Sequence, residues 1–217
     1  MNGYVRPSVP EQVYRDESGA VIDYGNRWGV ESPPDDSYTR TSNLDRFEPL
    51  LLVAEALIDH LVSTYEVTSA PFDFDDTGWN CSTIRAVRLT PTGEGRASLR
   101  FRLTDYPSVD VDSGLAHHVD FPRCSCDACD ETWKTCAEDI EHLVLAVAAG
   151  RFNEAIESDT DWDVPGERCT VGYRIEDPAR GASEDGTTYV AMTDERRAAA
   201  ALLDARPDRR WQPWSLR

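Results

Sequence analysis

Residues 121–131 read Phe-Pro-Arg-Cys-Ser-Cys-Asp-Ala-Cys-Asp-Glu and place three of the chain's six cysteines within six positions. A run of alternating residues, 115–121, leads into this stretch, and a run with helical spacing leads out of it to about Gly150. Alternation predicts a strand, and apolar residues at intervals of three and four predict a helix. We therefore expect a tight cysteine loop between a strand and a helix, with Asp127 or Asp130 capping the helix.

The spacing Cys-x-Cys-x-x-Cys favours a metal site made by Cys124, Cys126 and Cys129. Thiolates are good zinc ligands, and Cys-x-x-Cys is a common half-site spacing. A fourth ligand is needed, and we predict His118, which lies on the polar face of the preceding strand. The alternatives that stay open for the fourth ligand are His117, Cys136 and Asp127.

Two other interpretations of the loop compete with zinc. Cys126 and Cys129 flank two residues where a strand passes into a helix, as in thioredoxin-like redox motifs. A helix N-terminus lowers a thiol pKa, but the acidic neighbours oppose a thiolate, and the intervening strand and helix of that fold are missing. The plainest alternative is a set of reduced thiols that pack a turn. Catalysis by a Cys–His pair lacks an evident oxyanion loop, so we lean toward a protein that is not an enzyme.

Working outward from the loop, period-two runs predict strands and 3.6-period runs predict helices. The fold class is therefore α+β, with an antiparallel sheet of about five strands packed by two main helices. The expected strands are 83–90, 97–104, 115–121, 169–175 and 187–192, and the expected helices are 45–65, 130–150 and a short 194–205. Leu57 and Ile140 lie at the centres of the apolar stripes of the two main helices and should be buried.

No internal repeat or low-complexity linker divides the chain, so we predict a single domain, 1–217. Its first segment, 1–43, should be irregular apart from a short hairpin within 13–24. Residues 154–163 hold five acids and suggest a solvated loop, and Gly186 should fall in the connection of the last hairpin. The tail, 206–217, is basic and aromatic, and we expect it to pack on the chain's own acidic body.

The overall charge is strongly negative, since 22 Lys and Arg against 40 Asp and Glu leave −18. Such a surface repels nucleic-acid phosphates and anionic lipids and attracts a basic partner. No apolar run approaches the roughly 20 residues of a membrane span. The first residues also lack the apolar stretch of a secretion signal, so we expect a cytoplasmic protein.

Three stretches, 33–38, 46–50 and above all 121–131, resemble a family of uncharacterised proteins from high-GC actinobacteria. The loop of that family looks like Cys-Gly-Cys-Asp-Ala-Cys-Asp-Glu, and Ser125 stands here in place of the glycine. Serine adopts positive φ less readily than glycine, so the loop backbone is expected to differ slightly. The resemblance spans about residues 30 to 150 and implies a family of unknown function.

These observations predict a cytosolic accessory or protein-interaction protein with a structural zinc at the cysteine loop. The first alternative is a thiol-disulfide oxidoreductase that uses Cys126 and Cys129. The second alternative, supported by the net charge, is an acidic binder or inhibitor of a basic protein.

Overall fold

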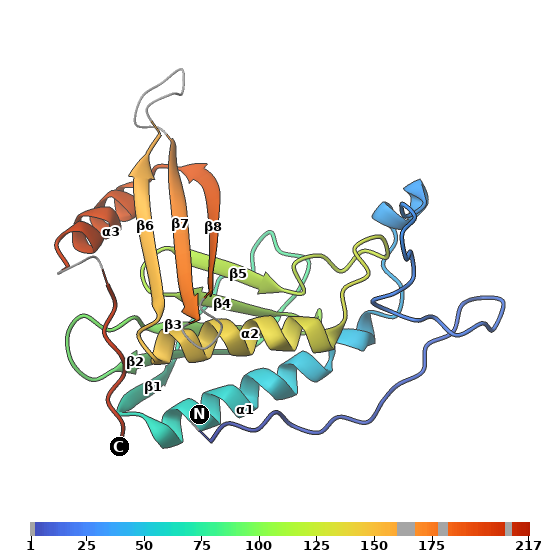
Figure 1. The fold of residues 1–217 in the computed structure, drawn as a ribbon, viewed down its shortest axis with the longest axis horizontal. Helices are drawn as coiled ribbons and strands as arrows, with labels where there is room; N and C mark the ends of the chain where they lie inside the picture. Colours follow the sequence, from blue (N-terminus) through green and yellow to red (C-terminus); the bar gives the residue numbers. More distant parts are fainter. Residues whose placement is uncertain (1–2, 160–167, 178–181, 207–209) are drawn as a thin grey trace.

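The computed structural model describes residues 3–159, 168–177, 182–206 and 210–217 (Figure 1). Within these residues, α-helices separate two runs of consecutive strands. In chain order they are α1 (Pro49–Thr64), β1 (Val67–Pro71), β2 (Thr83–Pro91), β3 (Leu99–Thr104), β4 (Val109–Ser113), β5 (His117–Phe121), α2 (Trp133–Ala148), β6 (Phe152–Ser158), β7 (Arg168–Asp177), β8 (Ala182–Ala191) and α3 (Asp194–Asp204).

The strands form two antiparallel sheets, one with the order β1-β2-β3-β4-β5 and one with the order β6-β7-β8. Figure 1 shows α1 and α2 side by side along one face of the five-stranded sheet, with α3 beside β6. The α+β class is confirmed. The predicted antiparallel sheet of about five strands is also confirmed, although its members differ in part. Strands β1, β4 and β6 were not predicted, and the predicted strands β7 and β8 pair with β6 in a second sheet.

Helix α1 starts later than the predicted residue 45 because Pro49 occupies its first turn. Proline lacks an N–H, and its fixed φ suits the first helical position, where that N–H would have no partner. The residues just before it form a short 3-10 helix, Leu44–Phe47. Helix α1 therefore enters the core directly after a tight turn.

Helix α2 is capped by Thr132 rather than by Asp127 or Asp130, so the predicted cap was wrong. The Thr132 hydroxyl accepts a hydrogen bond from the Thr135 N–H at 3.1 Å, and the Thr135 hydroxyl accepts one from the Thr132 N–H at 3.4 Å. This reciprocal pair satisfies two N–H groups at the start of the helix. The two aspartates are engaged elsewhere, as described below.

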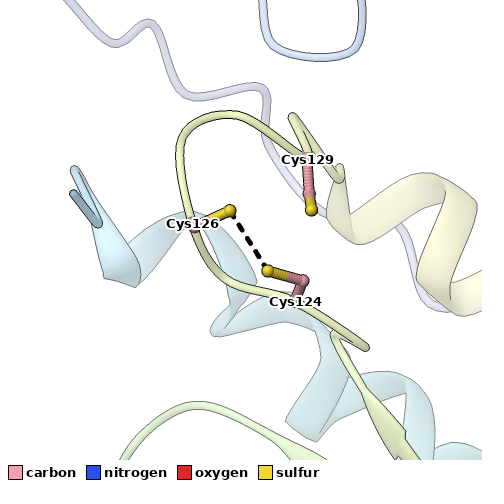
Figure 2. Close-up of side chains that lie close together, drawn as sticks. All are labelled: Cys124, Cys126 and Cys129. Carbon is pink, nitrogen blue, oxygen red and sulfur yellow. Dashed lines mark hydrogen bonds between the residues drawn. The ribbon is translucent and has the colours of Figure 1, made fainter. Parts of the chain in front are cut away.

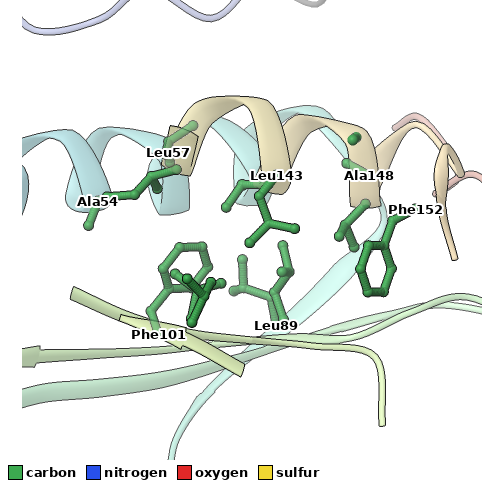
Figure 3. Close-up of a cluster of buried hydrophobic side chains, with 14 of the residues drawn as sticks. Ala54, Leu57, Leu89, Phe101, Leu143, Ala148 and Phe152 are labelled. Carbon is green, nitrogen blue, oxygen red and sulfur yellow. The ribbon is translucent and has the colours of Figure 1, made fainter. Parts of the chain in front are cut away.

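The two main helices bury their apolar stripes against the sheet. Figure 3 draws this layer, with Ala54, Leu57 and Leu143 of the helices facing Leu89 and Phe101 of the sheet. Leu57 and Ile140 are both fully buried, which confirms the prediction made from helical spacing. Apolar residues of both sheets join the same buried cluster, so the second sheet shares the core of the first.

The other face of the large sheet carries charged side chains at cross-strand positions. Arg102 on β3 lies opposite Asp110 on β4, and its guanidinium is 2.6 Å from that carboxylate. Arg100 similarly lies opposite Asp112, at 2.9 Å. Opposite charges at directly paired positions stabilise a sheet. These ion pairs allow β4 to form although it contains two acidic residues, Asp110 and Asp112.

The acidic stretch that begins at Glu154 forms strand β6 up to Ser158, so the predicted solvated loop was wrong for these residues. Glu154 is buried, and its carboxylate accepts hydrogen bonds from the backbone N–H groups of Leu115, Ala116 and His117 at 2.8, 2.9 and 3.2 Å. An acid is thus held inside because the β4–β5 turn supplies its donors. The remainder of the predicted loop, 160–163, lies outside the described residues.

The C-terminal tail packs on the fold. Trp211 and Trp214 of the tail are buried, and the Trp214 indole N–H donates to the Ala97 carbonyl at 2.9 Å. The tail also bonds to the fold through an ion pair between Arg210 and Glu176 at 3.0 Å, as expected for a basic tail on an acidic body. The predicted hairpin within 13–24 reduces to a single bridge.

The last predicted hairpin is longer than its sequence pattern indicated. Strands β7 and β8 pair from Arg168↔Ala191 to Asp177↔Ala182, so Gly186 lies within β8 rather than in the connection. Across the described part of the chain, every helix is too short or too polar to cross a membrane.

Candidate metal centre

The three loop cysteines converge. Their sulfur atoms all lie within 4.8 Å of one another, and Figure 2 shows the three side chains turned toward each other. The Cys124 thiol donates to the Cys126 sulfur at 3.2 Å. Cys124 and Cys126 are half-buried and Cys129 is exposed, so one side of the cluster faces solvent. The structure therefore brings together the three sulfurs that the spacing predicts as ligands.

The start and the end of the loop are clamped by Glu131. Its carboxylate accepts hydrogen bonds from the backbone N–H groups of Arg123 at 3.0 Å and Cys124 at 3.1 Å. Strand β5 ends at Phe121, where the following Pro122 cannot donate to a ladder. The chain therefore leaves the sheet at a fixed point and enters α2 at Trp133.

Asp127 anchors the middle of the loop to the N-terminal segment. Its side chain is fully buried, and its carboxylate accepts hydrogen bonds from the Ser42 N–H at 2.9 Å, the Ser42 hydroxyl at 2.8 Å and the Arg40 guanidinium at 2.9 Å. The Trp28 indole N–H donates to the Asp127 carbonyl at 3.2 Å. Because buried charge is stable only when paired and hydrogen-bonded, these contacts fix the residue between Cys126 and Cys129.

Asp130 holds the second attachment of the same segment. It adopts φ 53°, and its carboxylate accepts from the backbone N–H groups of Gly25 at 2.8 Å and Arg27 at 2.9 Å. Asx residues are among the few that tolerate this left-handed conformation. Asp127 and Asp130 are thus both used to bind residues 25–42, which explains why neither caps α2.

Ser125 adopts its place in the loop without positive φ. Its hydroxyl shares a hydrogen bond of 2.6 Å with the Tyr106 hydroxyl, and its carbonyl accepts from the Arg46 guanidinium at 2.8 Å. The serine side chain therefore ties the cysteine loop to the β3–β4 connection.

The structure does not place His118 with the three sulfurs. One ring nitrogen of His118 lies 2.7 Å from the Asp112 carboxylate and the other lies 2.8 Å from the Asp120 carboxylate. These contacts raise the pKa of His118 to about 10, mainly through the hydrogen bonds to Asp112 and Asp120. A protonated imidazole has no free lone pair for a metal. The cross-strand partner of His118 is Asp112, which explains why it stays on the sheet.

The other candidates for a fourth ligand, like His118, lie outside the sulfur cluster. The Cys136 thiol is buried in the α2 stripe and donates to the Glu131 carboxylate at 3.3 Å. His117 packs its ring 4.6 Å from that of Tyr173 and stays on the apolar face of β5. Among the residues that the structure describes, only the three loop cysteines form a group with metal-ligand spacing.

The sulfurs differ in their tendency to ionise. Burial acts to raise the pKa of Cys126, but the hydrogen bond from Cys124 and the N–H groups of Cys129 and Ala128 lower it overall. The pKa of Cys129 is raised to about 12, first by its hydrogen bond with Cys124. One thiolate is therefore favoured, and a second beside it is costly without a positive charge.

The arrangement departs from a thioredoxin-like motif at one point. Helix α2 begins at Trp133, and its cap residue, Thr132, follows Cys129 by three positions. The two cysteines Cys126 and Cys129 therefore lie in a turn before the helix rather than in its first turn. The effect of a helix N-terminus on a thiol pKa falls off within about one turn.

Sequence reasoning missed the residues that support the loop. Arg40 and Ser42 are separated from Asp127 by 87 and 85 positions, so no local pattern relates them. The acids within the loop were a usable signal, since an aspartate between two cysteines needs donors from elsewhere if it is buried.

Comparison with known proteins identifies the family of this chain. No curated protein and no solved structure matches this chain. A family of unknown function (DUF6226) matches residues 10–217, which is far more than half of the chain. This result confirms the expectation of an uncharacterised family that residues 33–38, 46–50 and 121–131 suggested. The chain belongs to the family of unknown function DUF6226.

Proposed function

We propose that Cys124, Cys126 and Cys129 bind one structural zinc ion and that the protein is a cytoplasmic accessory or protein-interaction protein. The observation that carries the proposal is the convergence of three sulfurs within 4.8 Å on one short loop. Tetrahedral zinc with Zn–S bonds of about 2.3 Å requires sulfur atoms about 3.8 Å apart. The sulfur spacings in the cluster, 3.2 Å for Cys124–Cys126 and at most 4.8 Å overall, lie on either side of this value.

The anchoring of the loop supports a structural role. Glu131 fixes one end, and Asp127 and Asp130 fix the middle and the far end to residues 25–42. A zinc ion bound by the three sulfurs would further fix the cysteine loop at the point where it contacts residues 25–42. Metal ligands held by buried hydrogen bonds lose little freedom on binding.

The fourth coordination position is assigned to water or to a side chain of a partner protein. His118 is bonded to two aspartates, and Cys136 is bonded to Glu131. Cys129 is exposed, which leaves the solvent side of the cluster accessible. A side chain from a partner would complete the four protein ligands that structural zinc sites have.

The test is metal analysis of tag-free protein purified under reducing conditions. We expect about one zinc per chain in the wild type and loss of zinc in Cys126→Ser. The matched control is Cys81→Ser, because Cys81 lies outside the cluster and its sulfur contacts the Arg102 guanidinium at 3.5 Å. Equal zinc in Cys126→Ser and the wild type would contradict the proposal.

A thiol-disulfide function is the second candidate, and the short distance between Cys124 and Cys126 supports it. Two thiols 3.2 Å apart are close enough to oxidise with little movement, which makes Cys124–Cys126 as suitable a pair as Cys126–Cys129. An insulin-reduction assay separates this function from zinc binding. Turnover that is lost in Cys126→Ser would favour the oxidoreductase.

A further inference from the structure

A groove beside α1 has an apolar lining and lies outside the cysteine cluster. It has a volume of about 460 Å³ and lies between the N-terminal segment, the start of α1, the start of β2 and the β3–β4 connection. The residues that line it are Val9, Pro10, Gln12, Glu48, Pro49, Leu51, Leu52, Ile84, Thr104, Asp105 and Pro107. A hollow of this size accommodates one or two side chains of a bound segment.

Two aliphatic side chains in the groove are left open to solvent. Leu52 on α1 is 55% exposed and Ile84 on β2 is 57% exposed, although both elements bury most of their other apolar residues. Single exposed aliphatics are common on protein surfaces, but here two from different elements share one concave lining. Covering both would remove apolar area from water, which is the main driving force for association.

The rigid walls of the groove favour side-chain recognition. Pro10, Pro49 and Pro107 all line it, and proline has no N–H to offer a bound backbone. A partner cannot add as a strand along these residues. It is recognised instead by placing an apolar side chain between preformed walls, which costs little conformational entropy on the protein side.

The charge at the groove is of one sign. Glu48 and Asp105 are its exposed charged residues, and no Lys or Arg is among the described residues that line it. The whole chain carries −18. An anionic rim around an apolar floor is complementary to an aliphatic side chain flanked by Lys or Arg.

We propose that this groove binds a protein segment that carries a Leu- or Ile-type side chain between basic residues. The groove and the zinc site are neighbours, since Tyr106 of the same β3–β4 connection bonds to Ser125 of the cysteine loop. The proposal for the groove does not depend on zinc binding. Loss of zinc and loss of peptide binding can be measured separately, so failure of one leaves the other standing.

The test uses three capped heptapeptides and the full chain with labelled methyl groups. The peptide KKLKLKK should bind and shift the methyl resonances of Leu52 and Ile84. The peptide EELELEE should not bind, because its charges repel the rim. The peptide KKSKSKK keeps the charge but lacks the anchors, so its affinity should be at least tenfold weaker than that of KKLKLKK.

Variants locate the binding. The double variant Leu52→Gln and Ile84→Thr should weaken KKLKLKK at least tenfold without unfolding the chain, since both side chains are exposed. Glu48→Lys should weaken it more than Asp59→Lys, which changes the net charge equally on the exposed side of the same helix.

Three results would overturn the proposal: unchanged affinity in the double variant, equal binding of KKLKLKK and KKSKSKK, or no binding of any of the three peptides at millimolar concentration. A fourth result, concentration-dependent shifts of the same methyl groups in protein alone, would assign the groove to a second copy of the chain instead.

Discussion

The buried carboxylate of Asp127 accepts hydrogen bonds from both the backbone N–H and the hydroxyl of Ser42, 85 residues earlier in the chain. Asp127 lies between two cysteines of the candidate metal loop. The N-terminal segment and the loop are therefore coupled through one side chain, and changes at that side chain should affect both.

We expect Asp127→Asn to destabilise the fold by about 2–3 kcal/mol, because an amide cannot accept from all the donors that the carboxylate serves. The measurement is the urea midpoint of unfolding. Asp36→Asn is the control, since Asp36 also pairs with Arg40, at 3.0 Å, but is largely exposed. That pair should contribute less than about 1 kcal/mol. Equal effects of the two substitutions would contradict the anchoring role of Asp127.

The positive charge on His118 should stabilise the fold, and this stabilisation should be lost as the pH rises into the alkaline range. Its pKa is raised to about 10 by Asp112 and Asp120, above the ordinary value of about 6.5. A raised folded-state pKa means that the stabilisation is complete below about pH 6.5 and is lost as the pH rises toward 10. The His118 side chain is 49% exposed, so solvent weakens both ion pairs. The measured pKa of His118 should therefore lie between about 6.5 and about 10.

An NMR titration of the His118 imidazole checks this directly. The stability difference between the wild type and His118→Gln should be largest near pH 6 and should shrink toward pH 10. A His118 pKa at or below 6.5 would show that the two aspartates do not hold the ring, and it would reopen His118 as a metal ligand.

Core packing gives a third prediction. Leu57→Ala and Ile140→Ala should each lower the free energy of unfolding by roughly 2–5 kcal/mol, since both side chains are fully buried. Leu52→Ala on the same helix as Leu57 should cost less than about 1 kcal/mol, because Leu52 is exposed. The measurement is urea unfolding of the three variants. A loss of unfolding free energy in Leu52→Ala as large as that in Leu57→Ala would show that the buried face of the helix is assigned wrongly.

The buried acid of β6 gives a fourth prediction. Removing the Glu154 carboxylate leaves the N–H groups of the β4–β5 turn and the Trp211 indole N–H without their acceptor. Glu154→Ala should therefore cost about 3 kcal/mol or more. Glu157→Ala, at an exposed position of the same strand, should be nearly neutral. Hydrogen exchange of the Leu115 and Ala116 amides should accelerate only in the Glu154 variant.

The elements that the sequence predicted well are those whose pattern is local. Helical spacing located α1 and α2, and alternation located the β2–β3 hairpin, since each buries one continuous apolar stripe or face. Membership of an uncharacterised family was also predicted, and the family match over residues 10–217 confirms it.

The elements and contacts that sequence reasoning missed depend on partners far away in the chain. Strand β4 contains Asp110 and Asp112, whose charges are matched by cross-strand arginines and, at Asp112, also by His118 of β5. Glu154 looked solvated because its donors lie 37 to 39 residues away. His118 was predicted as a ligand because it is close in sequence to the cysteines. In the structure its ring contacts the carboxylate of Asp112, its partner on the neighbouring strand.

The most direct test of the central claim is X-ray absorption at the zinc edge of tag-free, reduced protein, with the zinc content measured on the same sample. The account predicts about one zinc per chain, coordinated by three sulfurs at about 2.3 Å and one lighter ligand. Less than a tenth of a zinc per chain, or zinc surrounded by nitrogen and oxygen alone, would contradict it.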